Sequence, residues 1–473
     1  MYPHALHSDT EKWLFGKVIL INVSYKEQNL NINVSYKKHV VDIRSLREVV
    51  AESLSASIPD VFDRDIDVNI KLNKVIVIAG IRRCGKTYEL YNIMNKLMQM
   101  GVSRDNLLYI NFEDERLRGL NIKQLNDIIH LYHELANPSK NQIIYLFFDE
   151  LQNIDGWPQW VRRLYDSNLY RLFITGSSSK LLSYEIATAL AGRNVTYNIY
   201  PYSLKEFLNA KNVKTSKKEK YSSIGNFNKY ISEYIKLGGF PEVSMILSIN
   251  DKIRVLSSYY DAIVYRDVID RYKVRNVNAL SMTFRYAITT YAKEFSSTKT
   301  YNYFKSTGID ISKKTINSFI KYGESVFLYY LLYKFSKSFK KSYQSRKKIY
   351  ITDPGLLMLY EKGEDSGRLL ENAVCIELLR RKEKDPLLDI YYLKEDYGEV
   401  DFVITKQGTV RDLIQVTYEL SESDKKREIE PLIYACEEFN INSAKIITFD
   451  GEDTIKTDNK TIQILPFAEW QYL

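Results

Sequence analysis

Between residues 74 and 175 the chain alternates short apolar runs with longer amphipathic stretches. The runs have the length of buried strands, and the stretches between them have helical periodicity. The apolar runs are Val75–Ala79, Leu107–Phe112, Ile143–Phe148 and Leu172–Thr175. Strands that alternate with helices in this way predict an α/β fold with a parallel sheet covered on both faces.

The pattern changes twice further along the chain. A polar, charged stretch at 211–223 interrupts it, and the helical periodicity that follows predicts a helical lid. Two short helices, at 298–306 and 313–323, then precede two apolar strands, at 326–335 and 349–352, which a basic connection joins. This order of helix, helix, strand, basic loop and strand is typical of a winged helix.

The last hundred or so residues again mix strand and helix patterns, which predicts a separate α/β unit. Within the first 60 residues the hexapeptide INVSYK occurs twice, at 21–26 and 32–37, with alternating apolar positions that suit two short strands. A local duplication without function, or a start site placed too early, is the favoured alternative. The predicted domains are an N-terminal extension (1–60), a parallel-sheet core (61–210), a helical lid (211–291), a winged helix (292–352) and a C-terminal α/β domain (353–473).

Composition narrows the functional classes only a little. The 473 residues, 45% apolar and 27% charged, are typical of a globular protein of several domains. Three cysteines without a CxxC pair exclude a disulfide framework and fit a reducing cytoplasm, where we expect the protein. No apolar run reaches the roughly 20 residues of a spanning helix, so no membrane partner is expected. The net charge of +8 is compatible with a nucleic-acid partner without requiring one.

The first motif that carries chemistry is GIRRCGKT, which lies between the first strand and a helix and therefore has the context of a phosphate-binding loop. Backbone N–H groups of such a loop hold nucleotide phosphates, the side chain of Lys86 would reach the β- and γ-phosphates, and the hydroxyl of Thr87 would ligate Mg²⁺. The candidate nucleotide-binding residues are Gly80, Ile81, Arg82, Arg83, Cys84, Gly85, Lys86 and Thr87.

The second motif, IIYLFFDE at 143–150, is an apolar strand that ends in two carboxylates, at the edge where parallel sheets bind ligands. Asp149 would hold Mg²⁺, directly or through water, and Glu150 would polarise the attacking water. The strand at 107–112 lies between the two motifs in the sequence, as expected of NTPases in which an additional strand separates them in the sheet. The pair of motifs favours hydrolysis over binding alone.

Two further stretches offer candidate catalytic groups. TGSSS ends the fourth strand, so Thr175 or Ser177 could contact the γ-phosphate or the attacking water, with simple turn capping as the alternative. AGR supplies Arg193, a cation that could pair with transition-state charge in this subunit or a neighbouring one. A surface or structural role is the alternative for that arginine.

These motifs are followed, in order, by PYSLKEF, GGFP, YRD, KIYITDPGL, EN and EVDF. Over 74–417 the chain resembles a family of prokaryotic, largely archaeal, AAA-type ATPases whose C-terminal domain of unknown function contains a winged helix and a restriction-endonuclease-like fold. The resemblance implies a P-loop NTPase core with a helical lid, binding ATP with Mg²⁺, and an endonuclease-like α/β domain after the winged helix. The preference for ATP over GTP rests on this resemblance alone.

Endonuclease-like folds place an acidic residue on one strand and a Glu-x-Lys triplet on the next, which together bind a metal and activate water. Asp401 in EVDF supplies the first acid, and Glu371 or Glu377 would add another from the preceding helix. At the place of the triplet this chain has Gln415-Val416-Thr417, without the lysine. The sequence therefore predicts a degenerate fold that does not cleave nucleic acid.

The connection Lys334–Lys348 is rich in Lys and Arg and contains no acidic residue, so it could lie along DNA phosphates. On the preceding helix one face is apolar, which leaves Lys314, Asn317 and Lys321 on the other face as possible groove contacts. A solvated loop or a protein-docking surface is the alternative.

Two functions are compatible with these features. The first is Mg²⁺-dependent ATP hydrolysis coupled to binding of nucleic acid or protein. The second is an ATP-controlled DNA- or protein-binding regulator with little turnover. Either form could act as a homo-oligomer.

Overall fold

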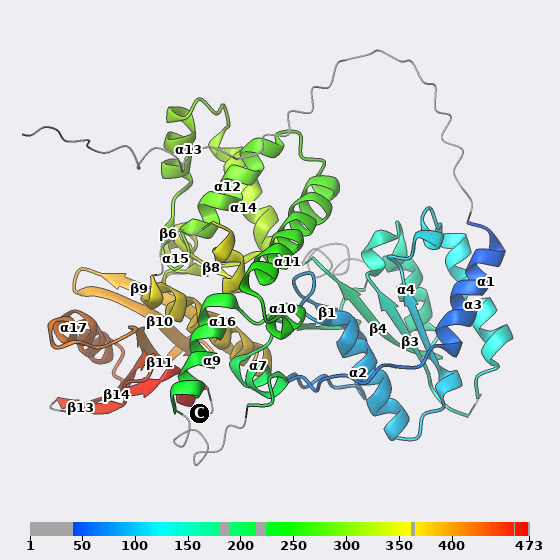
Figure 1. The fold of residues 1–473 in the computed structure, drawn as a ribbon, viewed down its shortest axis with the longest axis horizontal. Coiled ribbons are helices and arrows are strands. Elements are labelled where there is room, and N and C mark those ends of the chain that lie inside the picture. Colours follow the sequence, from blue (N-terminus) through cyan, green and yellow to red (C-terminus); the bar gives the residue numbers. More distant parts are fainter. Residues whose placement is uncertain are drawn as a thin grey trace, which may run out of the picture. The chain divides into compact units, whose positions relative to one another are not determined.

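The computed structural model describes residues 41–139, 141–178, 190–213, 224–360, 365–457 and 459–471. All of them belong to one unit, 40–473 (Figure 1). Both INVSYK copies, with the strands predicted for them, lie outside the described residues.

The first sheet is parallel and has the strand order β2-β3-β4-β1-β5. Its strands are β1 (Val75–Ala79), β2 (Leu107–Asn111), β3 (Ile144–Asp149), β4 (Tyr170–Gly176) and β5 (Asn194–Asn198). The predicted parallel α/β core is thus confirmed. One detail is corrected: the strand that separates β1 from β3 is β4, whereas the strand predicted at 107–112 lies at the sheet edge as β2. Order along the sequence does not fix order in a sheet, because helical crossovers can skip a strand.

Helices cover both faces of this sheet. On one face, Ile76 and Ile78 of β1 pack with the buried side of α2 (Lys86–Gln99). On the other, Val75 and Val77 pack with the helices that Figure 1 shows together on that side. These are α1 (Ile43–Ser55), α3 (Ile122–Ala136) and α4 (Trp157–Asp166). The helix α1 lies within the predicted N-terminal extension, yet it packs against α3 and β2. Short 3-10 turns are η1 (Arg104–Asn106), η2 (Glu115–Leu117) and η3 (Leu151–Asn153).

A group of helices follows the sheet. They are α7 (Leu204–Ala210), α9 (Ile224–Leu237), α10 (Pro241–Met245), α11 (Ile249–Ala262) and the π-helix η4 (Ile263–Asp270). The helix α7 lies within the predicted core (61–210), and the others lie within the segment 211–291 predicted as a lid, which is called the lid below. The GGFP turn between α9 and α10 is held from far along the chain, because the buried carboxylate of Asp353 accepts hydrogen bonds from the N–H groups of Gly239 (2.8 Å) and Gly355 (2.9 Å). Gly238 has φ +78°, and a Cβ there would overlap this carboxylate. Burial raises the pKa of Asp353 to about 7.

Helices and a small antiparallel sheet of order β6-β8-β7 come next. The elements are α12 (Val277–Thr289), β6 (Glu294–Phe295), α13 (Ser297–Ser306), α14 (Lys313–Ser325), β7 (Tyr329–Tyr333), α15 (Phe339–Gln344) and β8 (Lys347–Ile351). The order α13, α14, β7 and β8 is the predicted one, whereas α12 and β6 precede the elements that were predicted; the winged helix stays a prediction. The basic connection, predicted to be a loop, contains the short helix α15.

The C-terminal region is a mixed six-stranded sheet of order β13-β14-β12-β11-β10-β9, as the predicted second α/β unit requires. Its elements are η5 (Pro354–Leu359), α16 (Ser366–Lys384), β9 (Leu388–Glu395), β10 (Gly398–Lys406), β11 (Thr409–Val416), α17 (Glu422–Glu438), β12 (Ser443–Thr448), β13 (Asp453–Thr457), β14 (Lys460–Pro466) and α18 (Phe467–Trp470). A bridge between Lys334 and Tyr392 joins the end of β7 to β9. None of the described helices is long and apolar enough to cross a bilayer.

Candidate functional site

The loop between β1 and α2 has the backbone of a phosphate-binding turn. Gly85 has φ +106°, which favours glycine, and α2 begins at the next residue, Lys86. A Cβ on Gly80 would lie 2.2 Å from the carbonyl oxygen of Ile199, so only glycine fits there. The predicted loop residues Gly80–Thr87 thus form one turn at the carboxyl end of β1, at the N-terminus of a helix.

Asp149, the last residue of β3, accepts hydrogen bonds from two threonine hydroxyls. The hydroxyl of Thr87 donates to Asp149 Oδ2 at 2.6 Å, and the hydroxyl of Thr175 donates to Asp149 Oδ1. Burial raises the pKa of Asp149, and the charge of neighbouring Glu150 adds to this. A divalent cation would relieve that destabilised carboxylate, and Mg²⁺ prefers oxygen ligands of this kind. The residues Thr87 and Asp149 therefore fit the role predicted for them.

Glu150 is buried beside the loop lysine, with Lys86 Nζ 3.3 Å from Glu150 Oε1. Its N–H donates to Thr175 Oγ1 at 2.9 Å, which fixes the backbone at the end of β3. Burial alone would raise the pKa of Glu150, but the cations of Lys86 and Arg82 outweigh it and hold the pKa below its usual value. The pKa values of the neighbouring carboxylates Asp149 and Glu150 are thus shifted in opposite directions, and Glu150 is the one held in its ionised form.

Five contacts at this site were not found from the sequence. Gln152 Nε2 donates to Glu150 Oε2 and, at 3.4 Å, to Ser177 Oγ. Ser177 in turn donates to Asp267 of η4 at 3.4 Å, so the predicted Ser177 faces the lid. Arg82 in the loop forms ion pairs with Asp267 and with Glu113, which follows β2. The YRD motif was the available signal for Asp267, and Gln152 follows two residues after the IIYLFFDE motif.

Arg193 lies away from this site within the chain. Its carbonyl accepts the N–H of Val75 at the first residue of β1, whereas the phosphate loop follows the last residue of that strand. Its guanidinium pairs with Asp166 at 2.9 Å. The predicted role of Arg193 in its own subunit is therefore wrong. A role toward a neighbouring subunit stays a prediction.

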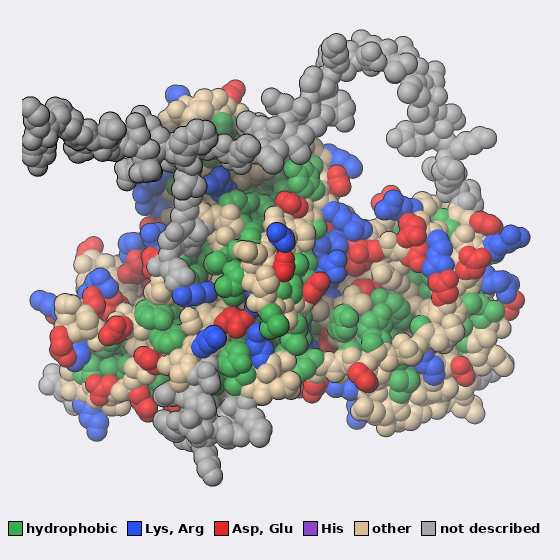
Figure 2. Space-filling view, viewed as in Figure 1, with side chains coloured by type: hydrophobic (Ala, Val, Ile, Leu, Met, Phe, Trp, Pro, Cys, Tyr) green, Lys and Arg blue, Asp and Glu red, His purple; other side chains and the backbone are tan. Residues whose placement is uncertain are grey.

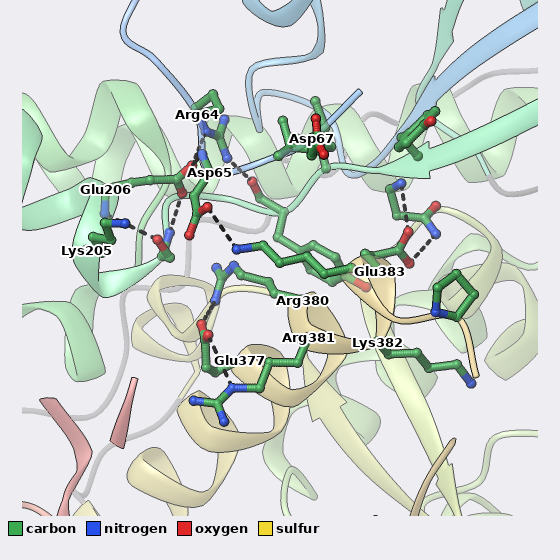
Figure 3. Close-up of a pocket in the computed structure, with 18 of the residues that line it drawn as sticks. Arg64, Asp65, Asp67, Lys205, Glu206, Glu377, Arg380, Arg381, Lys382 and Glu383 are labelled. Atoms are coloured by element: carbon green, nitrogen blue, oxygen red, sulfur yellow. Dashed lines mark hydrogen bonds and ion pairs between the residues drawn. The ribbon is translucent and has the colours of Figure 1, made fainter. Parts of the chain in front are cut away.

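Arg64 contacts the phosphate loop and two segments that follow β5. Its guanidinium donates to the carbonyls of Cys84 (2.9 Å) and Tyr200 (2.6 Å) and pairs with Glu206 at 2.8 Å. Arg64 also lines a cleft of about 830 Å³ between the core and α16. Figure 3 shows charged side chains of both signs along this cleft. Lys384 of α16 pairs with Asp65 at 2.8 Å, whereas Arg380 pairs with Glu377 of its own helix at 3.3 Å.

The C-terminal sheet contains a second buried charged cluster. Asp401 on β10 and Glu371 on α16 come together as predicted, but with Lys348 of β8 between them. Lys348 Nζ lies 2.9 Å from Glu371, 3.1 Å from Asp401 and 2.7 Å from Glu399. Burial alone would lower the pKa of Lys348, but the three carboxylates hold it well above its usual value. The expectation that Lys348 contacts DNA is wrong, because this residue is only 2% exposed.

The other predicted acid, Glu377, lies elsewhere. It pairs with Arg380 at 3.3 Å and lines the cleft of Figure 3. Gln415, at the place of the missing acidic ligand, donates to Glu428 at 2.7 Å and accepts the N–H of Asp401. Among the residues that the structure describes, no group of three or more His, Cys, Asp or Glu side chains is arranged to hold a metal ion.

The candidate DNA contacts divide into exposed and paired residues. On α14, Ile316, Phe319 and Ile320 are buried, as predicted. The exposed polar residues of this surface are Lys314, Asn317, Lys321, Lys340 and Lys341. By contrast Lys334 pairs with Glu395 at 3.0 Å and Arg346 with Glu294 at 3.5 Å. On the face shown in Figure 2, basic and acidic side chains are interspersed.

Known proteins resemble this chain over nearly its whole length. It is 39% identical to the uncharacterized protein MJ1544 of Methanocaldococcus jannaschii over 451 residues, which cover 93% of this chain and 98% of that protein. The chain belongs to the MJ1544 family. Another relative, an uncharacterized protein of Haemophilus influenzae, is 32% identical over 83% of this chain and 93% of its own.

Three family models match successive parts of this chain. Residues 72–208 match an AAA domain, which is a P-loop nucleotide-binding domain of the ATPase type. Residues 228–365 and 366–470 match two domains of unknown function, DUF8612 and DUF4143.

Two solved structures are also similar, at low level. They are the Orc1 protein of Aeropyrum pernix in complex with DNA (TM-score 0.30, 12% identity, 72% of this chain and 92% of that chain) and Cdc6p of Pyrobaculum aerophilum (TM-score 0.26, 11% identity, 70% and 93%). At these scores neither likeness supports an argument about function.

Proposed function

We propose that this member of the MJ1544 family is a Mg²⁺-dependent ATPase. The observation that carries the proposal is the pair of carboxylates after β3: Asp149 beside the Thr87 hydroxyl, and ionised Glu150 beside Lys86. One group has the ligands for a cation, and the other can accept a proton from water. When bound, Mg²⁺ supplies charge neutralisation for the phosphates.

The chain's own residues account for the remaining steps. The loop N–H groups and Lys86 would bind and orient the phosphates. A phosphate group near Lys86 would compete with Glu150 for the ammonium and so leave the Glu150 carboxylate available to the attacking water. Thr175 and Gln152 hold Glu150 from its backbone and its side chain, so they would keep the acceptor in place.

A second candidate is an ATP-controlled binding protein with little turnover. The contacts of both loop arginines with the lid favour it: Arg82 pairs with Asp267, and Arg83 lies over the ring of Tyr259, 5.6 Å from its centroid. A loop that contacts the lid in this way can transmit nucleotide binding to the rest of the chain.

Phosphate release measured with and without single- and double-stranded DNA separates the two candidates. An enzyme coupled to nucleic acid shows turnover that DNA increases, whereas a switch shows DNA affinity that changes with nucleotide and little turnover. Lys86→Ala is expected to abolish nucleotide binding and phosphate release in either case. Binding of ATP that is unchanged in this variant would contradict both.

The exposed lysines of α15 give a test of the DNA partner. Neutralising Lys340 and Lys341 together is expected to weaken DNA binding about equally across sequences. The slope of log K against log salt should fall by about 0.9 for each lost duplex phosphate contact. Asn317→Ala should instead change sequence preference, because a groove-facing side chain reads base edges. If neither the DNA affinity nor its salt slope changes, this surface does not bind DNA and is a solvated or protein-docking surface.

We further infer that the cluster around Asp401 does not cleave nucleic acid. The sequence suggested that the cluster has no lysine, but the structure places Lys348 in it. The ammonium of Lys348 lies among the carboxylates that would have to hold a metal. Plasmid incubated with Mg²⁺ or Mn²⁺ should therefore stay supercoiled. Nicking that disappears in Asp401→Ala would show that the inference is wrong.

A further inference from the structure

The phosphate loop and the lid are joined by a bidentate ion pair. Arg82 Nη2 lies 2.9 Å from Asp267 Oδ1, and Arg82 Nε lies 3.0 Å from Asp267 Oδ2. Both side chains are largely buried, with 12% and 5% of their surfaces exposed. Two parallel hydrogen bonds between a guanidinium and a carboxylate are the strongest form of this contact and define its geometry.

The segment that carries Asp267 has an uncommon backbone. Asp267 lies in the π-helix η4, which continues α11 without a break. Short π-helical segments are rare and frequently occur at functional sites. Asp267 also accepts a hydrogen bond from Ser177 at the end of β4, so one carboxylate contacts both the loop and the strand next to β3.

A second carboxylate holds the same guanidinium. Glu113 lies 3.0 Å from Arg82 Nη1 and 3.0 Å from Arg266, the residue before Asp267. Arg82, Arg266, Asp267 and Glu113 thus form an alternating set of two cations and two anions between the core and the lid. Arg82 is the member of this set that belongs to the phosphate loop.

We propose that Asp267 is a latch that competes with the triphosphate for Arg82, so that triphosphate binding loosens the lid at η4. Triphosphate oxygens are acceptors of the same kind as the Asp267 carboxylate, and a guanidinium used fully by one is not fully available to the other. A triphosphate that binds Arg82 must first break the contact with Asp267. By linkage, the free energy with which this contact holds the lid therefore lowers the nucleotide affinity by the same amount. This proposal rests on nucleotide binding at the loop, as proposed above.

The test uses Asp267→Asn, which keeps the shape of the side chain and removes its charge. Asp270→Asn is the matched control, because Asp270 lies on the same π-helix and is exposed. With the non-hydrolysable analogue AMP-PNP and Mg²⁺ as the probe, Asp267→Asn should bind about fivefold tighter or more. Asp270→Asn should bind as the wild type does. Glu113→Gln should change affinity in the same direction as Asp267→Asn, by less, because Glu113 is more exposed.

Amide hydrogen exchange of residues 263–270 is the second readout. In the wild type, AMP-PNP should increase exchange in this segment, and in Asp267→Asn the exchange should already be high and respond little to the analogue. Affinity unchanged or weakened in Asp267→Asn, or protection of 263–270 by AMP-PNP in the wild type, would overturn the latch. A wild type that binds no AMP-PNP would instead overturn the proposed function.

Discussion

Replacing Glu150 by Gln is expected to lower phosphate release about 10²- to 10⁴-fold, because the variant lacks the group that accepts the proton of the attacking water. ATP affinity should stay equal to or above that of the wild type, since a negative charge beside the phosphates is removed. Single-turnover phosphate release and equilibrium binding of ATP measure the two quantities separately. Binding without turnover would distinguish Glu150 from Lys86, whose loss removes both.

The control for this variant is Glu134→Gln on the exposed face of α3, where the carboxylate pairs with Arg47 on the surface. That variant should turn over ATP as the wild type does. If Glu150→Gln retains full turnover, the proton acceptor lies elsewhere, and the lowered pKa of Glu150 reflects only its structural pairing with Lys86.

Replacing Lys348 by Met is expected to destabilise the protein by about 3–5 kcal/mol at pH 8, because it leaves three carboxylates buried without their cation. The loss should shrink at pH 5. Burial raises the pKa of Glu371 to about 7 even beside Lys348, so this carboxyl binds its proton more readily in the folded than in the unfolded chain. Such a group stabilises the fold below about pH 4 and loses that contribution as pH rises toward 7.

Urea unfolding at pH 5 and pH 8 measures this difference. Lys347→Met is the matched control, because the neighbouring ammonium lies over the ring of Tyr333 at 4.8 Å, outside the cluster. Its cost should stay below about 1 kcal/mol at both pH values. Equal losses in the two variants, or a loss at Lys348 that does not depend on pH, would mean that the packing of the lysine stem matters more than its charge.

Features that follow from a motif, from helical periodicity or from the shared edge of parallel strands were predictable from the sequence. The loop Gly80–Thr87 is determined by its own glycines, and the end of β3 brings Asp149 to Thr87 because both follow parallel strands that end at the same edge. Likewise the apolar face of α14 follows directly from helical periodicity.

Contacts that no motif and no shared strand edge determines were not predictable in this way. Arg82 and Asp267 are 185 residues apart, and Lys348 and Asp401 are 53 apart. A lysine in a basic stretch resembles its exposed neighbours in sequence, so only the pleat of β8, which points alternate residues to opposite faces, separates Lys348 from Lys347. The position of β4 between β1 and β3 is also a property of the crossovers rather than of any one strand.

The contacts of Lys348 also bear on how the chain can be divided for separate expression. A C-terminal fragment that begins at residue 353 would contain Glu371, Glu399 and Asp401 but not the strand that neutralises them. It would also lose Tyr350, whose hydroxyl donates to Glu371 at 2.6 Å, and the backbone of Ile351, which bonds Asn372 in both directions. A fragment that starts before α12 keeps these partners. We expect this fragment to fold, and the one that begins at residue 353 not to fold.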